Sequence, residues 1–382
     1  MKEHKSVNQI NNFILLNDLT NYFSRRIIFT ESEVFLFMKQ LNGLNEKILN
    51  ETLDKIENIK AVLIGDICLD VYWVADMTKS VLSRETPHFP LPVVEERMSL
   101  GAGGNAANNM ATLCKNVSVV SVIGSDWRGV CLKNCLKNSG INDEYIVTVK
   151  DRITNAYCKP MRKGFLGFEV EDPRLDFESY SSIDEETEDK IIKNLYSATK
   201  GADVLCVSDQ FENGCITKKV RQAINEIAKN MLVVVDSRSR ISEYKNAFLK
   251  PNEIECARTL NLNDDHLTKA DEIETERTLK ELYNQTNSNI CLTLGKKGVR
   301  VLKDDKIYSC IGLKVEDPID TCGAGDCFLS AFSLSLAVKS EIIHASTIGN
   351  LASAISIKKI NTTGSASRQE ILNLFNKEAK DE

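Results

Sequence analysis

Residues 320–326 read DTCGAGD and place a carboxylate, Asp326, directly after two closely spaced glycines. Glycine lets backbone N–H groups come close to an anion, and the N-terminus of a helix favours negative charge. The apolar residues that follow predict a helix from about 325 to 336. We therefore expect Gly323, Ala324 and Gly325 to form an anion hole beside Asp326.

An anion hole next to a carboxylate suits phosphoryl transfer to a hydroxyl, because the carboxylate can accept the proton of the attacking group. The sequence thus predicts Asp326 as the catalytic base of a kinase that uses ATP. The structural alternative is a helix start after a glycine turn, without chemistry. No Walker A string and no set of protein-kinase motifs occurs in the sequence, so the predicted kinase belongs to another class.

Short apolar runs that alternate with helical stretches must position this loop. The sequence predicts strands at 61–66, 117–123, 204–207, 232–236 and 290–294, and helices at 106–114, 185–198, 218–229 and 272–285. This order predicts an α/β fold, with a central, mostly parallel sheet flanked by helices. Such sheets bind ligands at the carboxyl ends of their strands.

Three other stretches do not follow this order. Residues 71–98 and 155–177 carry alternating β-type residues together with prolines, which predicts a small antiparallel sheet that acts as a lid. Residues 1–57 have apolar residues at helical spacing and are predicted to form an N-terminal helical extension. The remainder, 58–382, is predicted to be one kinase domain.

The composition excludes several classes of protein. A net charge of −6 argues against a broadly basic nucleic-acid surface, and no apolar run is long enough to span a bilayer. The 12 cysteines are scattered without a C-x-x-C pair, which favours reduced thiols over a disulfide scaffold or a zinc site. The start of the chain lacks the features of a secretory signal. We expect a cytoplasmic protein that binds neither nucleic acid nor membrane.

Several motifs, taken in chain order, resemble those of the ribokinase-like carbohydrate kinase family. They are GAGGNAAN at 101–108, IGSDWRG at 123–129, KPNEIE at 250–255, TLGKKG at 293–298 and DTCGAGD at 320–326. The resemblance extends over about 60–370. It implies a ribokinase-like fold with a β lid, and ATP and Mg²⁺ as cofactors.

Within that family the sequence is most similar to the heptose-7-phosphate kinases. The similarity rests on GDICLDVYW at 65–73, PVV at 92–94 and RLDFE at 174–178. Departures occur at 210–214, where a shorter Gly/Lys turn is usual, and at Ser237-Arg238, where Pro-Lys is usual. We expect the kinase domain alone, without the fused nucleotidyltransferase domain of many relatives. The N-terminal extension is a further departure.

The residues predicted to bind the acceptor come from the first half of the chain. Asp66 and Asp70 stand at the mouth of the first strand, where carboxylates can accept hydrogen bonds from sugar hydroxyls. Gly103 and Gly104 allow close backbone approach, and Asn108 can donate to or accept from a hydroxyl. The structural alternative for the two aspartates is a turn or a helix cap.

The second half of the chain supplies the predicted nucleotide and metal residues. The family resemblance implies that Thr293, Gly295 and Gly298 bind the nucleotide, together with Thr321. Asn252 and Glu255 are predicted to hold Mg²⁺ through water, as hard oxygen ligands do. Their structural alternative is an N-capped helix start after Pro251.

Basic residues near the predicted lid bear on the charge of the acceptor. Cations flank the lid at Arg152, Lys159, Arg162, Lys163 and Arg174, and a phosphorylated substrate needs such donors. A solvated charged face is the alternative for these cations.

We therefore expect ATP-dependent phosphorylation of a sugar or sugar phosphate, best matched by a heptose-7-phosphate-type substrate bound by Arg174. A kinase for an unphosphorylated sugar or a nucleoside, and a non-catalytic sugar-sensing protein, are the competing hypotheses. We also expect a homodimer that forms through the lid.

Overall fold

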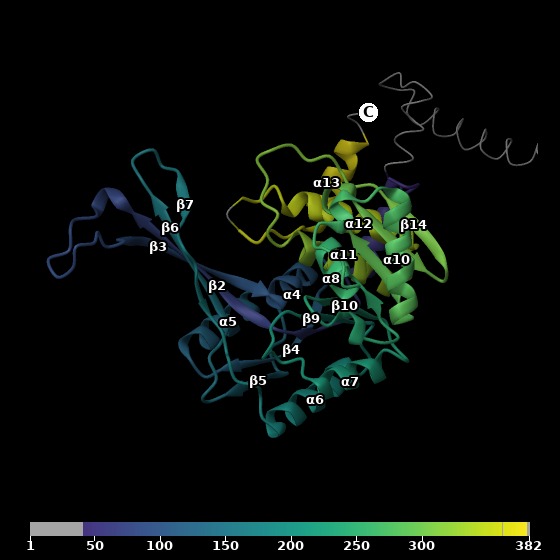
Figure 1. The fold of residues 1–382 in the computed structure, drawn as a ribbon, viewed down its shortest axis with the longest axis horizontal. Helices are drawn as coiled ribbons and strands as arrows, with labels where there is room; N and C mark the ends of the chain where they lie inside the picture. The colour runs from purple at the N-terminus through teal and green to yellow at the C-terminus, as the bar shows by residue number, and fades with distance from the viewer. Residues whose placement is uncertain (1–40, 361, 380–382) are drawn as a thin grey trace, which may run out of the picture.

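The computed structural model describes residues 41–360 and 362–379 of the 382-residue chain. Figure 1 shows a large α/β body from which one long β arm projects. Most of the predicted N-terminal extension, residues 1–40, lies outside the described residues. Its last part is the helix α3 (Glu46–Ile56), whose Leu49, Leu53 and Ile56 are buried in the body core.

The body is built on a sheet of nine strands within the described residues, and most of its strand pairs are parallel. The order is β14-β13-β12-β11-β10-β9-β1-β4-β5, and only the β12/β13 and β13/β14 pairs are antiparallel. The prediction of a mostly parallel sheet is confirmed. The strands are β1 (Lys60–Gly65), β4 (Asn116–Gly124), β5 (Ile146–Val149), β9 (Val204–Asp209), β10 (Val233–Ser237), β11 (Phe248–Leu249), β12 (Asn289–Thr293), β13 (Val299–Lys303) and β14 (Lys306–Cys310).

Helices cover both faces of this sheet because successive strand residues point to opposite faces. In β1, Leu63 packs in one apolar cluster, whereas Val62 and Ile64 pack in another. The first cluster includes α3, α4 (Gly103–Ala111), α5 (Trp127–Asn138), α11 (Ala324–Ala337), α12 (Ile342–Ser356) and α13 (Arg368–Glu378). The second includes α6 (Glu185–Thr199), α7 (Lys218–Ile227), α8 (Glu253–Thr259), α9 (His266–Lys269) and α10 (Glu272–Thr286). The short 3-10 helices are η1 (Met77–Lys79), η2 (Ile241–Glu243) and η3 (Gly295–Lys297).

The helix α11 is enclosed by its neighbours, which makes its N-terminus a rigid platform. Residues 327–335 are all buried. Phe332 stacks on Phe328 and meets Phe248 of β11 edge-on, with ring centroids 5.4 Å apart in both pairs. The Ser330 hydroxyl donates to the Ala106 carbonyl of α4 at 2.8 Å. Side chains at the start of α11 are therefore held in place by packing on several sides.

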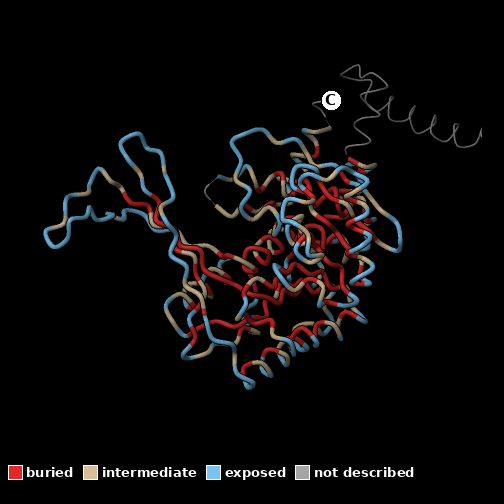
Figure 2. The backbone as a smooth tube through the Cα atoms, in the orientation of Figure 1, coloured by how far each residue is buried: buried red, intermediate tan, exposed pale blue. Residues whose placement is uncertain are grey.

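The arm is a separate five-stranded sheet, as the predicted lid requires, but it is mixed rather than antiparallel. Its strands are β2 (Ile67–Asp76), β3 (Val93–Ala102), β6 (Ala156–Lys163), β7 (Glu169–Glu171) and β8 (Leu175–Phe177). The strand β2 pairs antiparallel with β3 but parallel with β6. The prediction of a purely antiparallel lid was wrong, because β6 follows β2 only after the chain has passed through the body. Figure 2 shows the outer ends of the arm exposed and its root buried against the body.

Polar residues gather where four parallel strands of the body end. Asp66 follows β1, Asp209 ends β9, Asp236 lies near the end of β10, and Lys250 follows β11. These strands are neighbours in the sheet, so their carboxyl ends lie along one edge. The N-terminus of α11 and the root of the lid meet the same edge. Across the described residues, no helix is long and apolar enough to cross a membrane.

Candidate active site

The loop before α11 presents backbone donors at the start of a helix. The helix begins at Ala324, after Gly323 in a left-handed conformation with φ of 78°. A side chain at Gly323 would also collide with the Asn105 amide. No side chain caps this end of α11, and the first N–H groups of a helix have no acceptor within it. The Ala324 N–H already donates to the Thr321 carbonyl at 3.3 Å, which leaves the N–H groups of Gly325 and Asp326 for an anion at this end of the helix.

Asp326 lies in the first turn of α11 and has the pKa of a near-neutral base. Burial and, next, the charge of Asp236 raise its pKa from 3.8 to about 7. A hydrogen bond from Asn105 Nδ2 at 2.8 Å and the charge of Lys250 oppose this shift. A carboxyl with such a pKa can accept a proton and release it again at neutral pH.

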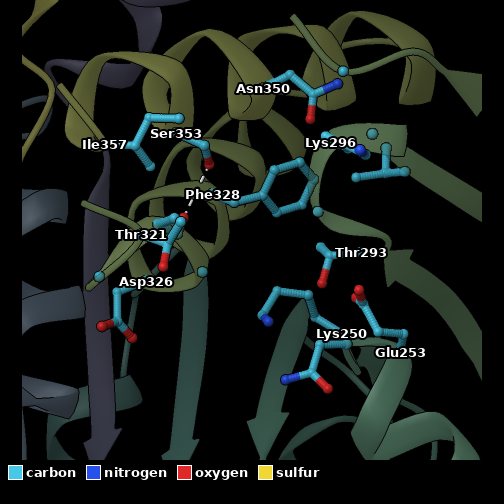
Figure 3. A pocket seen from close by; sticks show the side chains of 18 of the residues that line it. Lys250, Glu253, Thr293, Lys296, Thr321, Asp326, Phe328, Asn350, Ser353 and Ile357 are labelled. Carbon is cyan, nitrogen blue, oxygen red and sulfur yellow. Dashed lines mark hydrogen bonds between the residues drawn. The ribbon is translucent and has the colours of Figure 1, made fainter. Parts of the chain in front are cut away.

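A cavity of about 1030 Å³ opens in front of Asp326, and it contains the predicted catalytic, nucleotide and metal residues together. Its lining includes Asp326, the three anion-hole residues 323–325, Thr321, Asn252, Glu255, Thr293, Gly295 and Gly298. Figure 3 shows Asp326 and Lys250 low in the cavity, with Phe328 at its centre and Asn350 and Lys296 at the opposite end. The lining also includes Val299, Leu313 and Ile357. The cavity thus joins a charged end to apolar side chains, which suits a phosphorylated ligand with a flat apolar group.

A buried ion pair under the anion hole was not assigned a role from the sequence. Lys250 Nζ lies 3.2 Å from Asp236 Oδ2, and both side chains are nearly inaccessible to water. A Cβ atom added to Gly325 would lie 3.9 Å from the same Nζ. The available signal was a lysine and an aspartate at the ends of two short apolar strands. Their contact depends on β10 and β11 being neighbours, which the sequence does not state.

Asn252 and Glu255 form the helix cap that was the structural alternative. Asn252 Oδ1 accepts from the N–H groups of Ile254 and Glu255, and Glu255 Oε2 accepts from the Asn252 N–H. The Asn252 oxygen is therefore already used in capping α8. Burial and, next, the charge of Asp236 raise the pKa of Glu255 to about 7. Of this pair, Glu255 is therefore the residue whose carboxylate can still interact with a ligand in the cavity.

These carboxylates fit a divalent cation held through water. Asp236 raises the pKa of both Glu255 and Asp326, so three carboxyl groups share one region with the single buried ammonium of Lys250. The residues described contain no cluster of three ligands that could grip a metal directly. Mg²⁺ characteristically keeps several waters and takes few protein ligands, so the arrangement is compatible with it.

Asp70 lies on the lid side of Asp326. Its charge raises the pKa of Asp326, and its Oδ2 accepts from Lys159 Nζ of β6 at 3.1 Å. Lys159 also donates to the Tyr72 hydroxyl at 3.0 Å. A side chain at Gly101 would collide with the Asp70 carboxylate. Asp70 therefore lies between Asp326 and the lid, although it does not line the cavity.

Asp66 has a different role from the one predicted. Its carboxylate accepts three backbone hydrogen bonds, from Gln210 at 2.9 Å, Phe211 at 2.8 Å and Cys215 at 2.7 Å. It is buried beneath the loop 210–215 and does not line the cavity. The expectation that Asp66 binds sugar hydroxyls is corrected, because its acceptor sites hold this loop.

The glycines of 101–108 also serve packing. The Gly103 N–H donates to the Asp66 carbonyl at 2.8 Å, and a Cβ on Gly103 would crowd that oxygen. A Cβ on Gly104 would lie 3.3 Å from the Leu100 Cβ. Both glycines are buried and let α4 pack closely on β1 and β3. The close approach predicted at these glycines is therefore made by the protein's own backbone.

Asn105 replaces Asn108 as the amide beside the base. Asn108 Oδ1 accepts from the Ser139 hydroxyl at 2.8 Å, at the end of α5. Asn105 points to α11 instead and donates to Asp326. The prediction for Asn108 was wrong because the two asparagines lie within one turn of α4, and only the packing on α11 decides which of them reaches Asp326.

Most of the predicted cations of the lid already have partners, whereas Lys163 lies at the outer end of the β2/β6 pairing, opposite Asp76. Arg174 makes two hydrogen bonds to Asp176, at 2.6 and 2.7 Å, and its guanidinium lies 4.1 Å from the Tyr157 ring. Arg162 pairs with Asp172 at 2.8 Å. Arg152 donates to the carbonyls of Ser181 and Asn213. Arg174 still acts on the site, because its charge lowers the pKa of Asp70.

Comparisons with known proteins agree with this geometry. A family model described as "pfkB family carbohydrate kinase" matches residues 59–369. The bifunctional protein HldE of Campylobacter concisus is 31% identical over 329 residues, covering 84% of this chain and 65% of that protein. HldE of Aliarcobacter butzleri is 29% identical over 315 residues, covering 81% and 63%. The chain thus spans a little under two thirds of the length of these curated relatives.

Solved structures share the fold at low sequence identity. Ribokinase of Arabidopsis thaliana, complexed with ribose and ATP, is similar with a TM-score of 0.61 and 15% identity, covering 83% of this chain and 99% of that one. Phosphofructokinase-2 of Escherichia coli, in complex with fructose-6-phosphate, gives 0.65 and 16%, covering 84% and 99%. The fold is therefore ribokinase-like. Since the family model spans most of the 382 residues, this chain belongs to the pfkB family of carbohydrate kinases.

Proposed function

We propose that this kinase transfers the γ-phosphoryl group of ATP to a hydroxyl of a sugar or sugar phosphate, with Asp326 as the base. The observation that carries the proposal is a carboxylate with a pKa of about 7 in the first turn of a helix whose N-terminus has no side-chain cap. It faces a cavity large enough for a nucleotide. A hydroxyl held beside Asp326 would meet both a proton acceptor and an anion site.

In the proposed reaction, the acceptor hydroxyl gives its proton to the Asp326 carboxylate as its oxygen forms a bond to the γ-phosphorus. The bond from that phosphorus to the β,γ-bridging oxygen breaks, and ADP leaves with the electron pair. Backbone N–H groups of residues 323–325 and the Lys250 ammonium would receive the negative charge of the transferred group. Asn105 would keep the carboxylate aimed at the acceptor.

Two further groups would assist. Bound Mg²⁺ would neutralise phosphate charge, and Glu255 with Asp236 would hold it through water. The lid would close over the acceptor and exclude water, which otherwise competes for the phosphoryl group. Asp70, at the root of the lid, and Lys159 beside it would contact the acceptor from that side.

A heptose-7-phosphate-type sugar is the proposed acceptor. The sequence resemblance to the heptose-7-phosphate kinases supports this choice, as does the match to bifunctional HldE proteins. The ribokinase-like fold occurs with both kinds of sugar, since one structural relative was solved with ribose and another with fructose-6-phosphate. An unphosphorylated sugar or a nucleoside is therefore the alternative acceptor.

The test is ADP release from ATP with a panel of acceptors: a seven-carbon sugar 7-phosphate, the same heptose without phosphate, ribose, fructose 6-phosphate and adenosine. We expect the highest kcat/KM for the heptose phosphate. A neutral sugar or a nucleoside as the best acceptor would replace the proposed substrate. Sugar binding without any ADP release would favour the non-catalytic sensor. The Asp326→Asn variant, prepared in parallel, would identify a contaminating kinase.

The lid is also the proposed site of homodimer formation. Phe165, Leu166 and Phe168, in and beside the β6–β7 turn, are at least 75% exposed, and Val81 and Phe89 are exposed in the β2–β3 connection. Exposed apolar patches of this kind mark interaction surfaces. We expect a dimer by analytical ultracentrifugation, and a monomer after Phe165→Asp with Phe168→Asp. A monomeric wild-type protein at micromolar concentration would reject this surface.

The proposed site of action is the cytoplasm. All 12 cysteines are free in the structure, and most are buried. Free thiols persist in reducing compartments, where disulfides are rare.

A further inference from the structure

Near Asp70, the lid has few cations that are free to pair with an anionic acceptor, because Lys163, unpaired among the described residues, lies at the outer end of the β2/β6 pairing. Arg174, Arg162 and Lys159 are each paired with a carboxylate of the lid itself. A substrate phosphate would have to compete with Asp176, Asp172 or Asp70 for these cations. Binding of a dianion in a closing site is costly without donors to pair with it. A further cation is therefore needed near the acceptor.

Arg238 is such a cation. It lines the cavity beside Gln210 and Asp236, at the edge where β10 ends. Its backbone N–H donates to the Asp209 carbonyl at 3.1 Å. Within the described part of the chain, its guanidinium has neither an ion-pair partner nor a hydrogen-bond acceptor. All five N–H donors of this planar group are free to bind oxygen atoms of a ligand.

The backbone around Arg238 is fixed, so the free side chain projects from a rigid support. The buried carboxylate of Asp209 accepts from the Ser237 hydroxyl at 2.9 Å, from Arg240 Nε at 3.1 Å and from the Tyr244 hydroxyl at 2.8 Å. These contacts hold both chain neighbours of the 238–239 turn. Because this backbone is already fixed, only the exposed side chain of Arg238 would have to be ordered on binding.

Tyr157 marks the place where the lid meets the body near Arg238. It stands opposite Asp70 in the β2/β6 register, so it lies at the level of the Asp70 carboxylate. Its ring centroid is 6.3 Å from that of Phe211 in the body loop. Burial raises the pKa of the Tyr157 hydroxyl, as does the charge of Glu178, whereas the charges of Arg238 and Arg174 lower it. An anion at this junction would therefore meet one guanidinium from the body and one from the lid, with the Glu178 carboxylate as an opposing charge.

We propose that Arg238 binds the phosphate of the acceptor at the junction of lid and body, and so specifies a phosphorylated sugar. Arg174 approaches the same group from the lid. This inference rests on the proposed function, in which the acceptor hydroxyl lies beside Asp326. Arg238 binds the acceptor phosphate from the body, and lid closure then brings Arg174 to the same phosphate. A planar guanidinium can bind two phosphate oxygens at once, which an ammonium cannot.

The test compares Arg238→Met and Arg238→Lys with Arg162→Met, a matched removal of a lid cation that does not line the cavity. Calorimetry without nucleotide measures the affinity for a seven-carbon sugar 7-phosphate and for the same heptose without phosphate. One or two charge-assisted hydrogen bonds correspond to roughly a 10- to 100-fold change in affinity. We expect that loss in Arg238→Met for the phosphosugar only, a smaller loss in Arg238→Lys, and none in Arg162→Met.

The contrary results are distinct. Wild-type-like phosphosugar affinity in Arg238→Met overturns the assignment. A raised KM for ATP with unchanged phosphosugar affinity would place Arg238 on the nucleotide instead. If the wild-type protein phosphorylates neutral sugars but does not bind the phosphosugar, the inference fails and the kinase proposal stands. If no sugar yields ADP, the proposed function fails, and the calorimetric comparison still reports on Arg238.

Discussion

Replacing Asp236 by asparagine should move the pH at which the kinase loses activity. Asp236 is the charge that most raises the pKa of Asp326, after burial, to about 7. A base must be deprotonated to work, so activity of the wild-type enzyme should fall as the pH drops through about 7. Removing the charge of Asp236 lowers the pKa of Asp326, and the loss of activity should then occur at a lower pH.

The size of the shift follows from the charges around the base. A neighbouring charge commonly moves the pKa of a buried carboxyl by about one unit or more, and one unit corresponds to about 1.4 kcal/mol. The substitution also leaves the Lys250 ammonium, 3.2 Å from Asp236 in the native protein, free to stabilise the Asp326 carboxylate. Both effects have the same sign. At pH 6 the wild-type base is about one-tenth ionised, and after a shift of one unit it would be about half ionised.

The assay is kcat/KM for the acceptor between pH 5 and 9 at saturating ATP, with each profile normalised to its own plateau. Asp265→Asn, which removes a surface carboxylate paired with Lys269, is the control. Lys250→Met should move the acid limb in the opposite direction, to higher pH. Unpairing a buried charge costs about 3–5 kcal/mol of stability, so thermal unfolding must show that each variant is folded at the assay temperature. An acid limb that stays in place in Asp236→Asn would refute the electrostatic reasoning.

Three other predictions address the anion hole, the metal and the lid. Gly325→Val places a branched side chain where phosphate must approach the backbone, so activity should be lost while sugar affinity by calorimetry stays the same; full activity would mean that this loop is not the phosphate site. Activity should require Mg²⁺ or Mn²⁺. The variant Glu255→Gln keeps the cap of α8 and should raise the Mg²⁺ concentration that gives half-maximal rate. An unchanged Mg²⁺ titration would place the metal elsewhere. Arg174→Ala should raise KM for a phosphosugar and leave KM for ATP unchanged. The effect should be smaller than that of Arg238→Met, because Asp176 already neutralises Arg174. A raised KM for ATP would contradict this.

The fold was predictable because local patterns specify it, and the same patterns place the residues proposed to bind the nucleotide. Short apolar runs that end in polar residues predicted the parallel strands, and glycines before an apolar stretch predicted the start of α11 close to Ala324. The residues proposed to bind the nucleotide and the metal come from loops at one edge of a parallel sheet. Their convergence on one cavity follows from that topology.

The acceptor half was harder to predict because its contacts join distant parts of the chain. The role of Asp66 depends on the loop 210–215 passing over it. The choice of Asn105 over Asn108 depends on how α4 packs against α11. The Asp236–Lys250 pair depends on the order of the strands in the sheet. The importance of the free Arg238 guanidinium depends on which lid cations are neutralised by carboxylates of the lid itself. None of these relations leaves a periodic signal in the sequence.

The most direct test of the account is the turnover of Asp326→Asn, measured with ATP binding on the same preparation. Asparagine keeps the size of the side chain but cannot accept the proton, and general-base catalysis contributes roughly 10²–10⁴-fold. We predict that kcat falls by at least about a hundredfold, while the affinity for ATP by calorimetry and the melting temperature stay close to those of the wild type. Turnover within a few-fold of wild type in a folded, ATP-binding variant would contradict the claim that Asp326 is the catalytic base.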